Sequence, residues 1–267
     1  MKQFSVVGGG TMGSTIVAAL LANEIATPAG VVICEAVAAR RSHLEQEFGV
    51  AVTDDPALAA SEAPVVFIAV KPQDFPTVAA KLQGLIRPEQ LIVSIMAGIT
   101  VEALRAGLGH RSVVRVMPNT PAQIAQGMLV WTASSEVSDE QRAELQRMLA
   151  TMGREIYVPS ERQIDMATAV SGSGPGFVFL LIEAMIEGGV QIGLPRELAE
   201  ELVLQTVRGS AAFAQESDEH VAALRNMVTS PGGTTAAGLL AMENHGVRMG
   251  TMDAIIQAYR RATELGQ

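Results

Sequence analysis

Residues 4–13 read Phe-Ser-Val-Val-Gly-Gly-Gly-Thr-Met-Gly, and this stretch decides the fold of the first half of the chain. A short β-branched run ends at Gly8, and Gly8, Gly10 and Gly13 form the pattern G-x-G-x-x-G before an apolar helical stretch, residues 11–23. Between a strand and a helix, the first glycine turns the chain, the second lets the backbone approach a pyrophosphate, and the third allows close helix packing. We therefore predict a dinucleotide site here, in preference to a glycine-rich turn that serves only chain geometry.

Three further residues belong to this predicted site. Thr11 and Met12 stand at the start of the helix, where free backbone N–H groups suit an anion. Glu35 ends the second predicted strand, and its carboxylate favours NADH because it can accept a hydrogen bond from a ribose 2′-hydroxyl but repels a 2′-phosphate. Arg40 and Arg41 lie within reach of the same edge and could pair with that phosphate, or could be solvated surface arginines. The choice between NADH and NADPH stays open.

Strand-like runs alternate with amphipathic stretches over residues 1–159, which is typical of βαβ units on a parallel sheet. A capping box at Ser138 and Gln141 opens one of the helices. The fold class is therefore α/β, with a Rossmann-type doubly wound sheet in a domain of residues 1–159. The predicted strands are Phe4–Val7, Val31–Cys34, Val65–Ala69, Leu91–Ile95, Val113–Met117, Met128–Thr132 and Glu155–Val158.

The remaining residues, 160–267, show no strand signal and predict an all-α domain with helices over 177–192 and 196–214, separated by Gly-Leu-Pro. The first of these helices is apolar around most of its circumference, so it has to be buried on several sides. A domain of this size rarely does that alone, and we expect a homodimer whose helical domains pack together.

Composition excludes several functional classes. A net charge of −9 without a basic stripe argues against nucleic-acid binding. The single cysteine, Cys34, excludes an intrachain disulfide and fits a reducing compartment. The sequence shows no apolar run of the roughly 18 residues that a bilayer span needs, and no leader ahead of the first strand. We expect a cytoplasmic protein without membrane contact.

Three more loops are predicted at the carboxyl edge of the sheet, where ligands of doubly wound folds bind. Residues 69–72, Ala-Val-Lys-Pro, end one strand, and residues 94–98 and 117–121 end two others. Lys71 could touch the cofactor or could be a solvated loop lysine. Together these loops predict a cleft.

The chemistry has to come from a cofactor and hydrogen-bond donors. The four histidines are scattered without ligand spacing, so no metal site is predicted. Two glycine-rich segments, 171–176 and 229–235, are costly for folding alone. The second precedes a helix and resembles a cradle for a carboxylate, although an ordinary loop with Thr234 or Thr235 as the N-cap is the alternative.

These segments, in this order, resemble the pyrroline-5-carboxylate reductase family. The matching pieces cover essentially the whole chain, and Ser-Gly-Ser-Gly-Pro and Thr-Ser-Pro-Gly-Gly-Thr-Thr are the most specific. They are Gly8–Gly13, Ala69–Pro72, Ser94–Gly98, Arg115–Pro121, Ala169–Phe177 and Thr229–Thr235.

The resemblance implies an enzyme of proline biosynthesis that transfers a hydride from NAD(P)H to the C=N bond of 1-pyrroline-5-carboxylate, giving L-proline. It implies a helical dimerisation domain, often within a larger ring of dimers, and commonly NADPH as cofactor. Thr235 would hydrogen-bond the ring nitrogen as the catalytic residue. The substrate would be held by Ser230, Gly232, Gly233, Thr234, Thr235 and Thr168, and the nicotinamide and its ribose by Ala69, Val70, Lys71, Pro72, Ala97 and Gly98.

Two departures and three rival functions remain. Many relatives carry Asn, Ser or Asp in place of Glu35, and Asn226 stands where an acidic residue is frequent. A broader cyclic-imine reductase and a hydroxyacid dehydrogenase share this architecture, but such dehydrogenases usually carry a lysine that residues 165–192 lack. A non-catalytic NAD(P)-binding regulator would not need a carboxylate cradle at 229–235.

Overall fold

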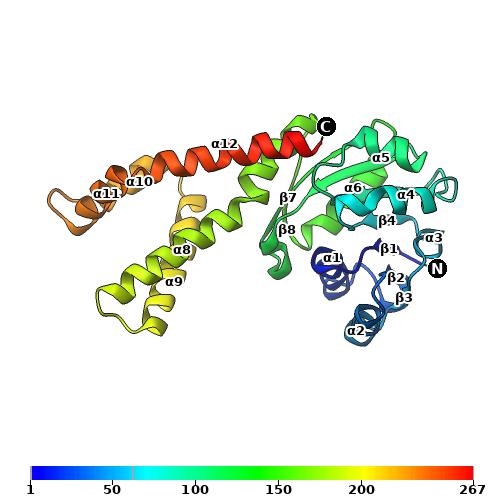
Figure 1. The fold of residues 1–267 in the computed structure, drawn as a ribbon, viewed down its shortest axis with the longest axis horizontal. Coiled ribbons are helices and arrows are strands. Elements are labelled where there is room, and N and C mark those ends of the chain that lie inside the picture. Colours follow the sequence, from blue (N-terminus) through cyan, green and yellow to red (C-terminus); the bar gives the residue numbers. More distant parts are fainter. Residues whose placement is uncertain (1, 62, 267) are drawn as a thin grey trace. The chain divides into compact units, whose positions relative to one another are not determined.

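The computed structural model describes residues 2–61 and 63–266, and they form two compact units. We call Met1–Ser173 with Gln257–Gln267 the sheet unit and Gly174–Ile256 the helical unit. The expected domain boundary at residue 159 lies earlier than this division, because helix α7 (Glu161–Ala167) packs against strands of the sheet. The order of elements along the chain can be followed in Figure 1.

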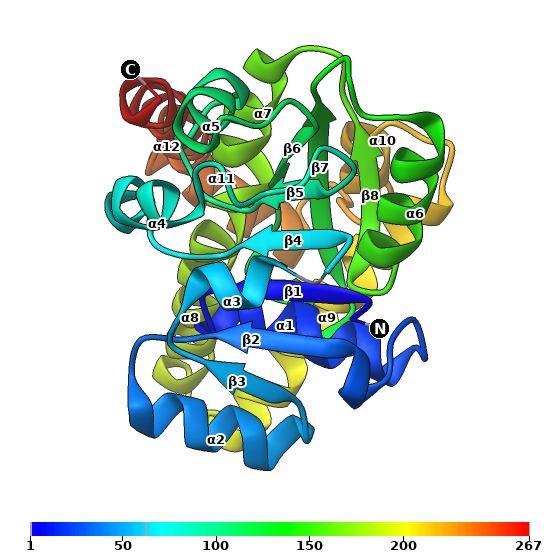
Figure 2. The same cartoon turned by 90° about the vertical axis from the view of Figure 1, so that its right-hand side faces the viewer.

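The described part of the sheet unit contains an eight-stranded sheet with the order β3-β2-β1-β4-β5-β6-β7-β8, seen in Figure 2. The strands are parallel from β3 to β6, β7 runs antiparallel to β6, and β8 is parallel to β7. The strand bounds are β1 Phe4–Val7, β2 Val31–Cys34, β3 Ala51–Thr53, β4 Val65–Ile68, β5 Leu91–Ser94, β6 Val113–Met117, β7 Gly127–Ala133 and β8 Gly153–Tyr157.

Helices cover both faces of this sheet. Side chains alternate along β1, so that Phe4 and Val6 join one apolar cluster and Val7 joins the other. Helices α1, α2 and α6 contribute to the first cluster, and α3, α4 and α5 contribute to the second. Their bounds are α1 Thr11–Ala22, α2 Ala38–Phe48, α3 Pro56–Ser61, α4 Phe75–Leu82, α5 Val101–Leu108 and α6 Asp139–Ala150.

Strand order reverses between β1 and β4, which lie side by side in register. At such a switch point the loops after the two strands leave in opposite directions and open a crevice at the carboxyl edge. The doubly wound fold is thus confirmed, as are the capping box of α6 and the seven predicted strands, to within two residues at their ends. Strand β3, which is only three residues long, was not predicted.

The helical unit is built from α8 (Gly174–Gln191), α9 (Arg196–Glu216), α10 (Val221–Met227), α11 (Thr234–Asn244) and the first half of α12 (Val247–Leu265). The two predicted helices correspond to α8 and α9, and Gly193, with φ of 105°, makes the left-handed turn between them. No side chain of α8 is buried in the described chain, and Phe179 and Leu180 are 57% and 64% exposed. A face this apolar needs a covering partner.

One expectation about membranes was wrong. We expected no stretch long and apolar enough to span a bilayer, yet the described chain has one helical stretch, Glu161–Gln191, that contains an 18-residue window with a mean hydropathy of 1.6. The glycines of residues 171–176 interrupt the helical sequence, and the structure has a π-helical turn, Thr168–Gly172, and a bend at Ser173 before α8 begins at Gly174. Length and composition alone are weak evidence for a membrane span, because core and interface helices share both.

Candidate active site

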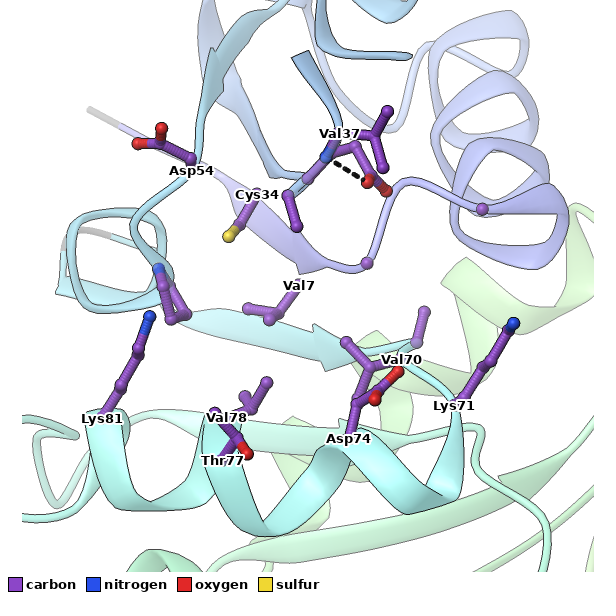
Figure 3. A pocket seen from close by; sticks show the side chains of 16 residues that line it. Val7, Cys34, Val37, Asp54, Val70, Lys71, Asp74, Thr77, Val78 and Lys81 are labelled. Atoms are coloured by element: carbon purple, nitrogen blue, oxygen red, sulfur yellow. Dashed lines mark hydrogen bonds between the residues drawn. The ribbon is translucent and has the colours of Figure 1, made fainter. Parts of the chain in front are cut away.

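A cavity of about 500 Å³ opens at the carboxyl edge of the sheet, at the β1–β4 switch point (Figure 3). Six of the predicted cofactor residues line it: Gly8, Gly10, Glu35, Ala69, Val70 and Lys71. They come from the loops after β1, β2 and β4. Of the three loops that the sequence predicted around a cleft, 69–72 lines this cavity, and 94–98 and 117–121 do not.

The three glycines of the motif have different surroundings. Gly8 has φ of 110°, and a Cβ there would lie 2.6 Å from the carbonyl oxygen of Ala69, so the crossing of the two loops requires glycine. A Cβ on Gly13 would overlap the carbonyl oxygen of Gly8. A Cβ on Gly10 would have nothing within 4 Å, which leaves open space above the start of α1. Two glycines thus serve packing, and the third leaves room for a ligand.

Charged side chains after β2 are engaged with backbone groups. Glu35 accepts hydrogen bonds from the N–H groups of Gly9 at 3.1 Å and Val37 at 2.8 Å. Arg41 donates to the carbonyl oxygen of Glu35 at 2.7 Å and pairs with Asp54 at 3.4 Å. Arg40 donates to the carbonyl oxygen of Gly9. Neither arginine is a loosely solvated surface residue.

Other predicted cofactor residues do not line the cavity. Thr11, Met12 and Gly13 form the first turn of α1 beside it, and Pro72 begins the short 3-10 turn Pro72–Asp74. Ala97 and Gly98 follow β5. A Cβ on Gly98 would lie 2.7 Å from the carbonyl oxygen of Leu265, so the last turn of α12 already accounts for a glycine at this position.

The far wall of the cavity was not predicted from the sequence. Figure 3 shows Asp74, Thr77, Val78 and Lys81 along α4 and its preceding turn, facing Cys34 and Asp54. These four residues are spaced by three and four positions, so they lie on one face of the helix. This spacing could indicate a binding wall only if α4 were already known to border the site. Burial raises the pKa of the Cys34 thiol to about 11, so the wall beside β2 carries a neutral thiol at physiological pH.

A π-helical turn, Thr168–Gly172, contains the predicted substrate residue Thr168. Asn119, just after β6, donates to the carbonyl oxygen of Ser171 at 3.0 Å and accepts from the N–H of Met128 at 2.9 Å. A Cβ on Gly172 would lie 3.0 Å from Met117 Cε. The end of β6 therefore holds this turn in place, and single π turns within helices are frequent at functional sites.

The predicted carboxylate cradle lies in the helical unit. Gly232 has φ of 70°, Gly233 donates its N–H to the carbonyl oxygen of Ser230 at 3.0 Å, and α11 starts at Thr234. The N-cap is Gly233, so neither Thr234 nor Thr235 is spent on capping. The N–H groups of the first turn have no helical partner and can receive an anion. Asn226, which stands where an acidic residue is frequent in the family that the sequence resembles, is exposed at the end of α10.

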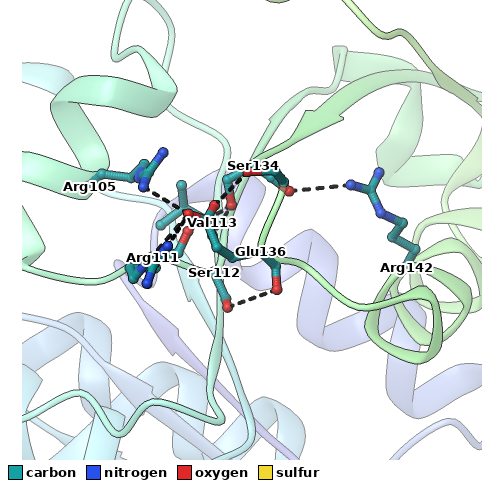
Figure 4. Close-up of polar contacts among 8 residues, drawn as sticks. Arg105, Arg111, Ser112, Val113, Ser134, Glu136 and Arg142 are labelled. Atoms are coloured by element: carbon teal, nitrogen blue, oxygen red, sulfur yellow. Dashed lines mark hydrogen bonds and ion pairs between the residues drawn. The ribbon is translucent and has the colours of Figure 1, made fainter.

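A separate polar cluster lies near the start of β6, away from the cavity lining (Figure 4). Arg105 and Arg111 both donate to Glu136 Oε1, at 3.0 and 2.9 Å. The hydrogen bond from Arg111 is the main cause that lowers the pKa of the Glu136 carboxyl. This cluster ties α5 to the β7–α6 loop, because Glu136 pairs with both arginines.

Two family models match this chain, one in each half. The family description "Pyrroline-5-carboxylate reductase dimerisation" matches residues 161–265, and "NADP oxidoreductase coenzyme F420-dependent" matches residues 3–98. Pyrroline-5-carboxylate reductases from Synechocystis sp. and Pseudomonas aeruginosa are 41% and 39% identical; each alignment covers 99% of this chain, and 98% and 97% of the relative.

Solved structures agree with the sequence relatives. A pyrroline-5-carboxylate reductase from Coxiella burnetii superimposes with a TM-score of 0.87 at 34% identity, over 100% of this chain and 99% of that one. A Plasmodium falciparum pyrroline carboxylate reductase with NADP bound gives 0.92 at 27% identity, over 100% and 98%. Together with the cavity over the glycine loop, these relatives identify a nicotinamide-dependent oxidoreductase. The chain belongs to the pyrroline-5-carboxylate reductase family.

Proposed function

We propose that this protein reduces the C=N bond of 1-pyrroline-5-carboxylate with a nicotinamide cofactor and releases L-proline. The observation that carries the proposal is the cavity over the glycine loop, in a chain that matches pyrroline-5-carboxylate reductases from end to end. The apolar exposure of α8 supports a homodimer, and a ring of dimers is the larger assembly that we propose. Cytoplasmic location goes with this biosynthetic role.

The residues around the cavity fit a dinucleotide. Space above Gly10 and the free N–H groups of Thr11, Met12 and Gly13 suit the pyrophosphate. Ala69, Val70 and Lys71 form the part of the wall nearest the switch point and would border the nicotinamide half, with Pro72, Ala97 and Gly98 next to them. The bound cofactor supplies the hydride.

The substrate is proposed to bind through its carboxylate and its ring nitrogen. Backbone N–H groups at the start of α11, together with Ser230, Gly232 and Gly233, would hold the carboxylate, and Thr168 would border the ring. Thr235 would hydrogen-bond the nitrogen. A protonated imine is already electrophilic at carbon, so the protein needs no strong general acid. Its main contribution is to fix the ring carbon against the hydride donor.

We further propose that the enzyme prefers NADH over NADPH. The Glu35 carboxylate lines the cavity and is held there by two N–H groups. Arg41, which could neutralise a 2′-phosphate, is paired with Asp54, and this pair carries no net charge. A 2′-phosphate would therefore meet the Glu35 carboxylate, while the Arg40 guanidinium is bonded to Gly9 and Ser14 of the glycine loop. The NADP bound to a 27%-identical relative argues the other way.

One assay tests both proposals. Purified protein is mixed with 1-pyrroline-5-carboxylate and either NADH or NADPH, and loss of nicotinamide absorbance is followed while proline is measured by amino-acid analysis. We expect stoichiometric proline and a higher kcat/KM with NADH. Binding of NADH without any turnover of this imine would support the regulator instead, and a higher kcat/KM with NADPH would reject the cofactor proposal.

A further inference from the structure

The backbone N–H and the carbonyl oxygen of Gly9 are both hydrogen-bonded to charged side chains that follow β2. Glu35 Oε2 accepts a hydrogen bond from the Gly9 N–H at 3.1 Å, and Arg40 Nε donates to the Gly9 carbonyl oxygen at 2.9 Å. The same guanidinium donates through Nη2 to Ser14 Oγ at 3.2 Å. Arg40 therefore bridges the glycine loop, from Gly9 on one side to the first turn of α1 on the other.

The partners of Arg40 are themselves fixed. Ser14 Oγ lies 3.0 Å from the carbonyl oxygens of both Gly10 and Thr11, so its proton is directed to the backbone and its lone pairs are left for Arg40. A Cβ on Gly9 would lie 2.5 Å from Leu44 Cδ1, so α2 presses directly on the loop. The bridge thus connects three well-anchored elements.

The Arg40 bridge orders the glycine loop before a ligand binds. Three consecutive glycines, Gly8–Gly10, lose much conformational freedom when the loop is ordered, and a loop that is ordered beforehand binds its ligand more tightly. The guanidinium is half-buried and lies against the residue before Gly10, the glycine with open space above it. A cation in this place is screened less than a surface cation and favours a doubly charged pyrophosphate.

We propose that Arg40 is a positioning residue for the cofactor pyrophosphate. Arg40 does not itself line the cavity; it holds the glycine loop in its binding conformation through Gly9 and Ser14 and adds positive charge to that loop. The role differs from recognition of a 2′-phosphate, which the sequence alone allowed for this arginine. It rests on the nicotinamide cofactor of the proposed function and requires no statement about the imine substrate.

Ligand titrations on the full-length protein, without substrate, test this role. NADH binding is followed by its fluorescence, and NADPH, ADP-ribose and adenosine compete against it, for the wild type, Arg40→Met and Arg40→Lys. We expect Arg40→Met to weaken the three pyrophosphate ligands by a similar factor of about 10, the effect of one charge-assisted contact, and to leave adenosine within about twofold. Arg40→Lys keeps the charge but cannot span both acceptors, so it should recover only part of the affinity. Arg147→Met makes the same substitution at an exposed arginine on α6, away from the glycine loop; it controls for the loss of one positive charge and should bind like the wild type.

Several outcomes would overturn the proposal. They are wild-type NADH affinity in a folded Arg40→Met, an equal loss for adenosine, a much larger loss for NADPH than for NADH, and full recovery in Arg40→Lys. If Arg40→Met does not fold, Arg40→Lys and Ser14→Ala carry the test, and Ser14→Ala should show a smaller loss confined to the pyrophosphate ligands. Failure to reduce the imine would leave these titrations unaffected, so the two proposals fail separately.

Discussion

Replacement of Arg115 by methionine is expected to destabilise the protein by about 3 kcal/mol. The Arg115 side chain on β6 is 2% exposed, and its guanidinium lies 2.9 Å from Glu161 Oε1 and 2.7 Å from Asp165 Oδ1, both on α7. Removal of one partner from a buried ion pair costs about 3–5 kcal/mol. We take the lower end because the side chains of Glu161 and Asp165 are 31% and 19% exposed, so water can partly solvate them. In addition, the buried Arg115 Nε has no hydrogen-bond partner in the described residues, so the substitution also removes the free-energy cost of burying this unpaired donor.

Urea unfolding at one fixed protein concentration measures the effect. Trp131, the single tryptophan, is a suitable fluorescence probe because it is 1% exposed and pairs with Val116 of β6. The control adds Glu161→Gln and Asp165→Asn to Arg115→Met, which leaves no unpaired carboxylate and should recover at least half of the loss. A loss below about 1 kcal/mol for Arg115→Met, or a control variant as unstable as the single one, would refute the reasoning.

Four further predictions concern the site. Thr235→Val removes a hydroxyl at nearly constant shape and should lower kcat about 10- to 100-fold with an unchanged melting temperature, whereas Thr235→Ser should keep most activity. Equal values of kcat for the wild type and both variants would remove Thr235 from the mechanism. Glu35→Gln should raise the NADPH-to-NADH ratio of kcat/KM by roughly tenfold, since one negative charge near the 2′-phosphate is lost, and a constant ratio would contradict the electrostatic argument. Gly13→Ala should lower both the melting temperature and NADH affinity because its Cβ overlaps the Gly8 carbonyl, while Gly10→Ala should lower affinity alone; the reverse pattern would show that the packing roles were misassigned. The pKa of Cys34 is raised from 9.0 to about 11, so in the folded protein its thiol should react with a disulfide reagent at pH 8 about 100-fold more slowly than in the urea-unfolded protein. The corresponding contribution to stability is fully present below pH 9 and is lost as the pH rises through 11. Equally fast labelling of the folded and the unfolded protein would disprove the burial of this thiol.

The fold could be predicted because its signals are local. The apolar runs that became β1, β2 and β4 are buried at every position, as strands covered on both faces should be. Strand β3 lacks that signal, since Ala51 is exposed and the other two residues of the strand, Val52 and Thr53, are only half-buried. The antiparallel direction of β7 was not predictable, because strand direction depends on the path of the connecting turn at Thr120–Ile124 and not on composition.

The site was predictable where a motif marks it. The glycine loop and Glu35 lie where expected, but the wall formed by α4 has no motif of its own. Gly98 illustrates a different limit: family resemblance assigns it to the cofactor, while the structure shows a close neighbour, Leu265, that is distant in sequence. The π turn was also hidden: the three glycines in Ser171–Gly176 predict an interruption of the helix, but not that it takes the form of a π turn at Thr168–Gly172.

The packing of Leu265 on Gly98 matters to anyone who handles this protein at the bench. The final turn of α12 is wedged against the loop after β5, and a Cβ on Gly266 would lie 3.5 Å from the Gly98 carbonyl oxygen. The last turn of α12 should therefore be kept in any shortened variant, because its removal would open a notch beside β5.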